Sequence, residues 1–336
     1  MQVSGARGTA QGSWSAVAAL ACGCALALAL PALVAPPEGR EAGCARWVVA
    51  DRDGAALVLL DDDLMLAGRL PVPWPTHARA RPAGGFWVVS ATQGHPRAGQ
   101  RLRLLGAPGQ EPAELELPPA IDLEIDALGR ALLLVRAPAG ATLVLKASPG
   151  VIEERFEVGC DARSLAPGGS QLGVAAGREG LLVLDEAGHG RRRAPSGATS
   201  SVLDAAALGE GAWVVLERGD SLGSERVLVL DEDLRVTHQT SCPGAERLAV
   251  GPGPSGAVWV IESAGRWVRR IHPRPRQGPE LVHLPALGAS AAQVDSRGGL
   301  VLAAPGAILR VSLEGEAEAG QGGFVRLTDI AAVTPP

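Results

Sequence analysis

Short apolar runs alternate with polar turns along most of the chain. The run Trp213–Leu216 is followed by a polar break and then by Val227–Leu230, which Asp231 closes. Six other segments repeat the first of these runs: Trp47–Ala50, Trp87–Ser90, Leu132–Val135, Leu172–Ala175, Trp259–Glu262 and Leu300–Ala303. Successive runs begin 40–46 residues apart. Seven copies at this period indicate one repeat domain of the propeller or solenoid type.

Each repeat is long enough for four strands: an approach strand, the core run, a second apolar run and an outer strand. The second runs are Leu57–Leu60, Leu102–Leu105, Leu143–Leu145, Leu181–Leu184, Val227–Leu230, Trp267–Val268 and Ile308–Val311. Turns rich in aspartate and glycine follow several of them, because these residues supply local hydrogen bonds and left-handed backbone angles. The pattern predicts an all-β fold, a seven-bladed β-propeller. Six or eight blades are the alternatives if one loose repeat is wrongly assigned.

The two ends of the repeat array complement each other. The first repeat has a core run but no approach strand, whereas the last repeat is followed by a spare strand, Thr328–Val333. A C-terminal strand that completes the N-terminal blade would remove the open sheet edge that otherwise invites aggregation. We therefore expect the propeller to be closed by its C-terminal strand.

The N-terminus predicts export. Residues 16–35 carry no charge and are interrupted only by Pro31. Such a segment is either a cleaved signal peptide or a membrane anchor formed by residues 14–35. We expect residues 1–44 to be this leader with a short linker and residues 45–336 to be a single propeller domain. The domain is then extracytoplasmic: periplasmic, secreted, or anchored to the outer face of the membrane.

Composition restricts the partners. The net charge of −5 gives no reason to expect nucleic acid. Beyond the leader only Cys44, Cys160 and Cys242 remain, an odd number without metal-ligand spacing, and we expect them to be mostly free. The sequence implies no cofactor, and we expect a monomer.

Several segments resemble a known repeat unit. Asp329–Ala331, Leu123–Gly129 followed by Leu132–Val135, and Val227–Asp231 are similar to the repeat of NHL-type propellers and of the related gluconolactonase-like superfamily. The resemblance covers roughly residues 45–334 and is one of fold. It implies a metal site made by a Glu, Asn and Asp constellation in the gluconolactonase-like enzymes, but this chain contains no asparagine. Nor does any stretch match the His and acid context of streptogramin-lyase-like propellers well enough for residues to be carried over.

Propellers bind ligands at one mouth of the central channel, where the approach strands begin. Aligning these strands on one position predicts a ring around the channel made of Asp329, His77, Asp122, Arg163, Asp204, Arg247 and Ala291. Acids alternating with arginines form mutual ion pairs that hold the ring together, or they form a binding surface. Both interpretations stay open at this stage.

The longest loop at this mouth, 91–100, carries His95 and Arg97. If it folds inward, His77, His95 and Asp122 would provide two imidazoles and a carboxylate for a divalent metal. The alternative is that His95-Pro96 is an ordinary exposed turn, and we assign no metal ligand.

Three other groups of residues have structural and functional interpretations. The charged loop Glu217–Asp220 is a second candidate for ligand binding at the channel mouth. The basic clusters Arg191–Arg193 and Arg269–Arg276 would either attract anions or protect sheet edges from pairing with other sheets. The tryptophans that open four core runs are expected to fill the space between blades.

Two functions follow. The first is an exported, non-catalytic module that binds a protein, a small molecule or a glycan at the channel mouth. The second is a metal-dependent hydrolase or lyase of the gluconolactonase or streptogramin-lyase type acting there. The absence of a transferable catalytic pattern favours the first.

Overall fold

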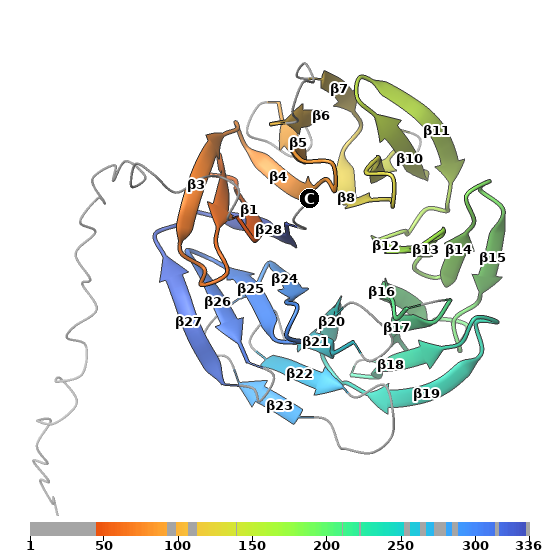
Figure 1. Cartoon of the computed structure of the whole chain (residues 1–336). Coiled ribbons are helices and arrows are strands. Elements are labelled where there is room, and N and C mark those ends of the chain that lie inside the picture. The colour runs from red at the N-terminus through yellow and green to blue at the C-terminus, as the bar shows by residue number, and fades with distance from the viewer. Residues whose placement is uncertain are drawn as a thin grey trace, which may run out of the picture. The chain divides into compact units, whose positions relative to one another are not determined.

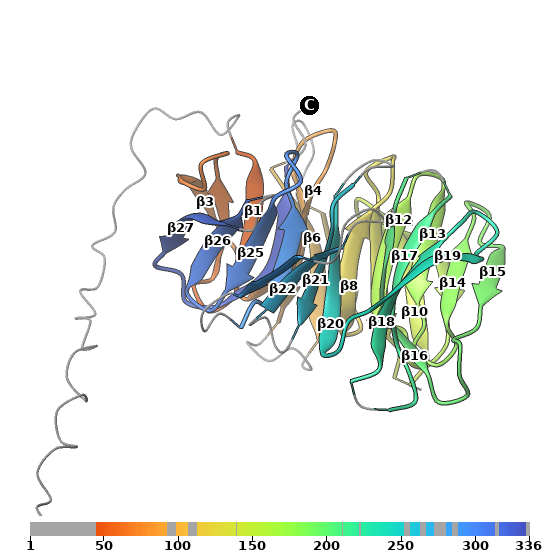
Figure 2. The same ribbon diagram turned by 90° about the horizontal axis from the view of Figure 1, so that it is seen from below.

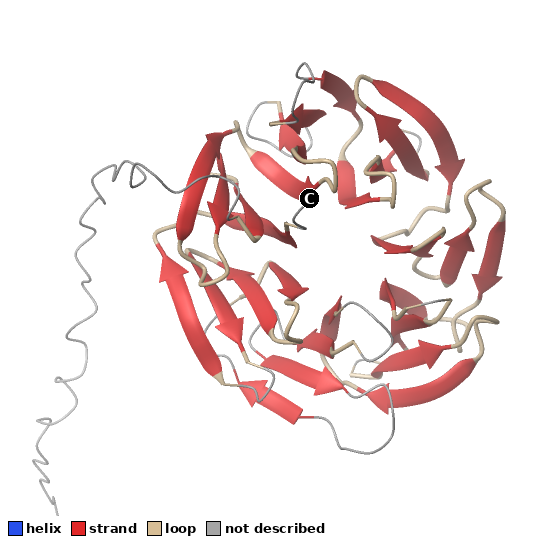
Figure 3. Cartoon of the chain, viewed as in Figure 1, coloured by secondary structure: helices blue, strands red, loops and turns tan. Residues whose placement is uncertain are grey.

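Seven four-stranded antiparallel sheets form a ring in the computed structural model (Figure 1). The structure describes residues 45–333 except 93–98, 107–112, 139, 210, 222, 252–255, 263–266, 272–279, 284–287 and 313–315. All regular elements among these residues are strands (Figure 3). No helix in this part of the chain is long and apolar enough to cross a membrane. The seven-bladed propeller predicted from the repeat is confirmed, and the alternatives of six and eight blades are wrong.

Each blade runs from an inner strand at the ring axis to an outer strand at the rim. Blade 1 contains β28 (Leu327–Ala332), β1 (Trp47–Asp51), β2 (Ala56–Leu60) and β3 (Leu66–Pro71). Blade 2 contains β4 (Pro75–Ala80), β5 (Phe86–Ala91), β6 (Gln100–Leu105) and β7 (Ala113–Leu117). Blade 3 contains β8 (Ala120–Ile125), β9 (Ala131–Arg136), β10 (Thr142–Ser148) and β11 (Val151–Glu157).

The remaining blades repeat this order. Blade 4 contains β12 (Ser164–Gly168), β13 (Gln171–Ala175), β14 (Leu181–Leu184) and β15 (Gly190–Arg193). Blade 5 contains β16 (Ser201–Ala207), β17 (Trp213–Arg218), β18 (Glu225–Leu230) and β19 (Val236–Ser241). Blade 6 contains β20 (Ala245–Val250), β21 (Val258–Glu262), β22 (Trp267–Ile271) and β23 (Glu280–His283). Blade 7 contains β24 (Ala291–Val294), β25 (Leu300–Ala304), β26 (Ala307–Val311) and β27 (Ala317–Gly322).

Closure by the C-terminal strand is confirmed. β28 pairs antiparallel with β1, so that Trp47 lies opposite Ala332 and Val49 opposite Ile330. The buried carboxylate of Asp51, at the end of β1, accepts a hydrogen bond of 3.0 Å from the backbone N–H of Arg326. The first and last segments of the propeller are therefore joined by a strand ladder and by a side chain. Seen from the side, β1 and the strands of blade 7 lie next to each other (Figure 2).

Apolar side chains fill the space between neighbouring blades. The core strands are almost wholly apolar, as expected for strands that are covered on both faces by the next sheet. Each of the seven buried apolar clusters combines side chains of two adjacent blades; one, for example, joins Trp87 and Leu102 of blade 2 to Leu123 and Leu133 of blade 3. The core is therefore a ring of seven interfaces.

The four tryptophans that open core strands are buried in these interfaces, as predicted, but they do not occupy one equivalent position. Trp87 and Trp259 pack against the blade that follows, whereas Trp47 and Trp213 pack against the blade that precedes. The difference follows from the pairing of each core strand with its inner strand. Counted from the inner-strand residue after the bulge, Trp47 and Trp213 pair one residue further along than Trp87 and Trp259. In a strand, such an offset turns a side chain to the opposite face.

Trp213 shows how closely the blades approach. Its indole lies over Gly173 of blade 4, where an added Cβ atom would be 2.5 Å from Trp213 Cζ3. Gly173 thus provides the room that the tryptophan needs. By contrast, Trp87 and Trp259 donate their indole N–H to the turn glycines Gly129 and Gly298 of the following blade, at 2.9 and 3.0 Å.

Candidate functional site

The inner strands share a feature that directs their side chains toward the channel. In five of the seven blades, the inner strand pairs with its core strand through a β-bulge close to its first residue. These inner strands are β28, β4, β8, β16 and β20. A bulge adds one unpaired residue and re-aims the side chains that follow it. The residues after the bulges are those that the alignment placed around the channel: Asp329, His77, Asp122, Asp204 and Arg247.

Three aspartates at this position make the same pair of hydrogen bonds. One carboxylate oxygen accepts the backbone N–H of the next residue, and the other accepts a backbone N–H from the inner strand of the following blade. For the second bond, Asp329 Oδ2 lies 3.0 Å from Ala78 N, Asp122 Oδ2 lies 2.8 Å from Leu165 N, and Asp204 Oδ2 lies 2.8 Å from Leu248 N. These carboxylates connect blades 1 to 2, 3 to 4 and 5 to 6.

Other polar contacts connect the remaining blades. Arg79 of blade 2 binds Glu124 of blade 3 at 2.9 Å, and Ser164 of blade 4 donates its hydroxyl to Asp204 of blade 5 at 2.6 Å. Arg247 of blade 6 donates to the carbonyl oxygen of Ser290 of blade 7. The Ser290 hydroxyl lies 2.9 Å from the carbonyl oxygen of Leu327 in blade 1. The seven inner strands are thus tied into a closed polar ring.

The predicted ring is one residue out of register in blade 4. There the backbone N–H that the preceding aspartate reaches belongs to Leu165, so the residue equivalent to Asp122 is Ser164 and not Arg163. Arg163 is exposed and lies just before β12, where it still lines the channel. The cause is that β12 lacks the bulge of its neighbours, as its unbroken pairing with β13 shows.

Three predicted residues have shifted pKa values. Burial lowers the pKa of His77, and the nearby Arg79 guanidinium adds to this, so the imidazole is neutral at pH 7. Burial raises the pKa of Asp122 to about 8, with a further contribution from the Glu124 carboxylate beside it. Burial also raises the pKa of Asp204, against the hydrogen bond from Ser164. The wall of the channel therefore combines neutral and charged titratable groups.

Of the hypothetical metal-binding set, only His77 and Asp122 lie among the described residues. His77 Nδ1 lies 3.2 Å from the hydroxyl oxygen of Thr76, whose own proton is donated to the carbonyl of Val89. His95 and Arg97 lie outside the described residues. Within the part of the chain that the structure describes, no group of three histidine, cysteine or acidic side chains is arranged to hold a metal ion.

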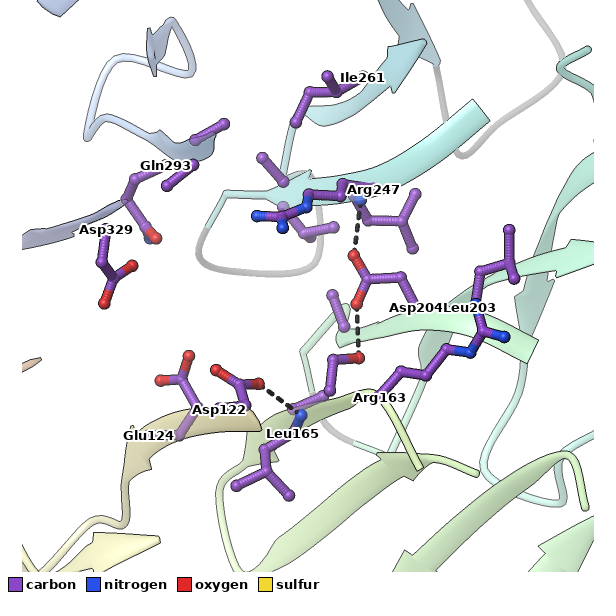
Figure 4. A pocket seen from close by; sticks show the side chains of 18 of the residues that line it. Asp122, Glu124, Arg163, Leu165, Leu203, Asp204, Arg247, Ile261, Gln293 and Asp329 are labelled. Carbon is purple, nitrogen blue, oxygen red and sulfur yellow. Dashed lines mark hydrogen bonds between the residues drawn. The ribbon is translucent and has the colours of Figure 1, made fainter. Parts of the chain in front are cut away.

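The inner strands of all seven blades surround a cavity of about 690 Å³. Its wall includes His77, Asp122, Arg163, Asp204, Arg247, Ala291 and Asp329, which are the seven residues of the predicted ring. Figure 4 shows Asp122, Glu124 and Asp329 on one side of this pocket and Arg247 reaching toward that side from β20. The cavity is predominantly polar, because the bulges turn these side chains inward.

Sequence reasoning missed several polar residues of the wall, among them Arg79, Glu124 and Gln293. A signal for two of them was present, since Arg79 and Glu124 lie two positions after His77 and Asp122. Alternate residues of a strand share a face, so the inward position i implies i+2. Arg79 bridges two blades, with Asp329 Oδ2 at 2.5 Å and Glu124 Oε1 at 2.9 Å.

The other charged candidates mainly join neighbouring elements. Asp220, in the loop after β17, accepts a bond of 2.6 Å from the Thr199 hydroxyl. In the basic cluster of β15, Arg191 and Arg193 donate to carbonyl oxygens of Glu232 and Leu234 in the next blade. Of the second basic cluster, residues 269–271 belong to β22 and residues 272–276 lie outside the described residues. Cys160 and Cys242 are both free thiols.

Comparisons with known proteins identify the fold. No family model matches the sequence, and no curated protein matches it either. Solved structures do match: a streptogramin B lyase has a TM-score of 0.58 at 11% identity, over 88% of this chain and 95% of that one. The dihydro-heme d1 dehydrogenase NirN, in complex with DHE, has a TM-score of 0.57 at 13% identity, over 89% and 77%.

A third match is PorZ, a surface component of the type-IX secretion system of Porphyromonas gingivalis. Its TM-score is 0.50 at 14% identity, over 74% of this chain and 33% of that one. In total, 850 chains of solved structures match this chain. The neighbours include enzymes and a secretion component, so the comparisons show the propeller fold that the repeat resemblance implied and leave its function open.

Proposed function

We propose that this protein is an exported, non-catalytic propeller that binds its ligand or protein partner in the channel mouth. The observation that carries the proposal is the polar cavity of about 690 Å³ enclosed by all seven inner strands. Binding sites are concave, largely preformed and supplied with a few convergent polar groups. The ring of contacts between blades keeps this cavity in shape without any ligand.

The polar ring also supports a binding role over a catalytic one. Asp122, Asp204 and Asp329 each use both carboxylate oxygens to accept backbone hydrogen bonds. Groups held in this way are poor candidates for proton transfer to a substrate, because the transfer would break contacts between blades. Their role is to stabilise the channel wall, from which other side chains contact the ligand.

A second candidate function is a metal-dependent hydrolase or lyase at the same mouth. The observation in its favour is that His77 and Asp122, two titratable groups with shifted pKa values, line one cavity. Such groups in a cleft are typical of sites that move protons.

A variant that fills the cavity tests the binding proposal. Gln293 lines the channel wall, and Gln293→Trp places a bulky side chain there. A matched control is Val151→Trp, because Val151 is an exposed residue of the outer strand β11. Thermal melts are recorded with a panel of sugars, peptides, carboxylic acids and divalent metals including Zn²⁺.

We expect at least one compound class to raise the melting temperature of the wild type and of Val151→Trp but not of Gln293→Trp. A ligand at a hundredfold excess over its dissociation constant stabilises by about 2.7 kcal/mol, which such melts resolve. The proposal fails if no class shifts the wild type or if the shift survives in Gln293→Trp. A shift produced by Zn²⁺ alone and lost in His77→Ala supports the second candidate instead.

Export has a separate test. The proposal that the domain is extracytoplasmic rests on the uncharged segment at residues 16–35. A reporter fused after Pro336 that functions only outside the cytoplasm is expected to be active. The same fusion lacking residues 1–44 is the control and should be inactive. Activity of a cytoplasm-specific reporter on the full chain would contradict export.

A further inference from the structure

The channel cavity has two unlike walls. On one side Asp122, Glu124 and Asp329, which we call the acidic arc, lie on the inner strands of blades 1 and 3. Arg247 reaches toward them from β20 of blade 6, and Gln293 of blade 7 lies between Arg247 and Asp329, beside Asp329 (Figure 4). Opposite charges therefore face a shared space of about 690 Å³.

The acidic arc is only partly neutralised. Arg79 lies between two of its carboxylates, bound to Asp329 at 2.5 Å and to Glu124 at 2.9 Å, and one guanidinium balances one carboxylate. Burial and the neighbouring Glu124 raise the pKa of Asp122, and both of its oxygens already accept backbone N–H groups. Glu124 uses Oε1 for Arg79, and among the described residues nothing is bonded to its Oε2.

The opposite wall offers unused donors. Arg247 is exposed, and its one contact with the described residues is the bond from Nη1 to the carbonyl oxygen of Ser290. A guanidinium has five N–H donors, so most of those of Arg247 are available to an anion. The Gln293 side chain has no hydrogen-bond partner within the described part of the chain. This wall is suited to a carboxylate, which arginine binds through two parallel hydrogen bonds.

We infer that the ligand of the channel is a small amphoteric molecule, such as an amino acid or a short peptide. Its ammonium group binds the acidic arc at Glu124, and its carboxylate binds Arg247 and Gln293. This inference rests on the proposed function, since it specifies the chemistry of a ligand bound in the same cavity.

The lining of the cavity disfavours other ligands. A molecule of one charge sign meets a wall of like charge, which costs binding energy. Among the described residues that line the cavity there is no tryptophan or phenylalanine, so flat rings and sugar faces find no large aromatic surface for stacking. The tryptophans of the core strands are used between the blades instead.

Blocked peptides test the inference on the wild-type protein. Calorimetric titrations use alanine and its unblocked peptides of two to four residues, which differ in the distance between the two charges. The best binder is then compared with its N-acetyl form, its C-terminal amide and the doubly blocked peptide. We expect each single block to weaken binding at least tenfold and the double block to abolish it.

Substitutions at two positions test which wall binds which end of the peptide. In Arg247→Gln, the free and C-amidated peptides should bind equally weakly, and in Arg247→Lys the preference for the free carboxylate should return in part. Glu124→Gln should equalise the free and N-acetylated peptides. Melting curves of each variant without ligand exclude a loss of fold, and the blocked peptides test the inference even if a variant is unstable.

The inference is overturned if no unblocked peptide binds or if blocking either terminus leaves affinity unchanged. The cavity-filling experiment separates this result from failure of the proposed function. If sugars or carboxylic acids, but not peptides, stabilise the wild type and not Gln293→Trp, then the channel binds a ligand of another class. In that case the proposed function stands and the amphoteric ligand does not.

Discussion

Removing Phe324–Pro336 should abolish the cooperative unfolding of the whole propeller. The deletion takes away β28 and the segment just before it, which together supply the buried side chains of Phe324, Leu327 and Ile330 to the interface with blade 7. Losing a large buried side chain costs about 2–5 kcal/mol. Three such losses reach the entire stability of a typical domain, about 5–15 kcal/mol. The deletion also exposes the edge of β1 and removes Asp329 from the polar ring.

The measurement is a thermal melt followed by far-ultraviolet circular dichroism. A chain that lacks only residues 334–336 is the control, because it retains all of β28. We expect the control to melt like the full chain and the longer deletion to aggregate or to lose its sigmoidal transition. If both melt at the same temperature, strand closure does not stabilise this propeller.

Asp329→Ala should be the most damaging single substitution in the channel wall. The aspartate side chain is 9% exposed and pairs with Arg79, which is 15% exposed. Removing one partner of a buried ion pair typically costs about 3–5 kcal/mol, and here the Arg79 guanidinium would keep Glu124 as its one remaining carboxylate among the described residues. The backbone N–H of Ala78, which Asp329 accepts, also loses its partner. We expect the free energy of unfolding, measured with urea, to fall by about 3 kcal/mol or more.

A second background separates these contributions. In Arg79→Met there is no guanidinium to lose a carboxylate partner, so Asp329→Ala should cost at least about 1 kcal/mol less there than in the wild type. The exposed pair of Asp233 with Arg235, at 3.4 Å, provides the matched control. Asp233→Ala should change stability by less than about 1 kcal/mol. Equal losses for Asp329→Ala and Asp233→Ala would show that the polar ring does not hold the blades together.

The candidate site was predicted in part from local patterns. The residue after each inner-strand bulge was found by aligning repeats, because in blades 2 to 7 the inner strand comes shortly before an apolar core run. Blade 4 was misaligned by one residue, since the absence of a bulge in β12 cannot be recognised in the sequence. Arg79 and Glu124 follow from strand alternation. The contacts of Arg79 do not, because its two partners are 250 and 45 residues away.

By itself, the sequence determined the fold class and the closure by the C-terminal strand, and it favoured seven blades over six or eight. These properties depend on the spacing of apolar runs, and an apolar run must be buried wherever it lies along the chain. Only the tertiary structure decided which face each tryptophan takes and which backbone N–H each aspartate reaches. It alone showed that Arg247 faces an acidic arc across a cavity. Those facts depend on bulges of one residue and on contacts between strands that are distant in sequence. Neither feature produces a periodic pattern in the amino-acid sequence.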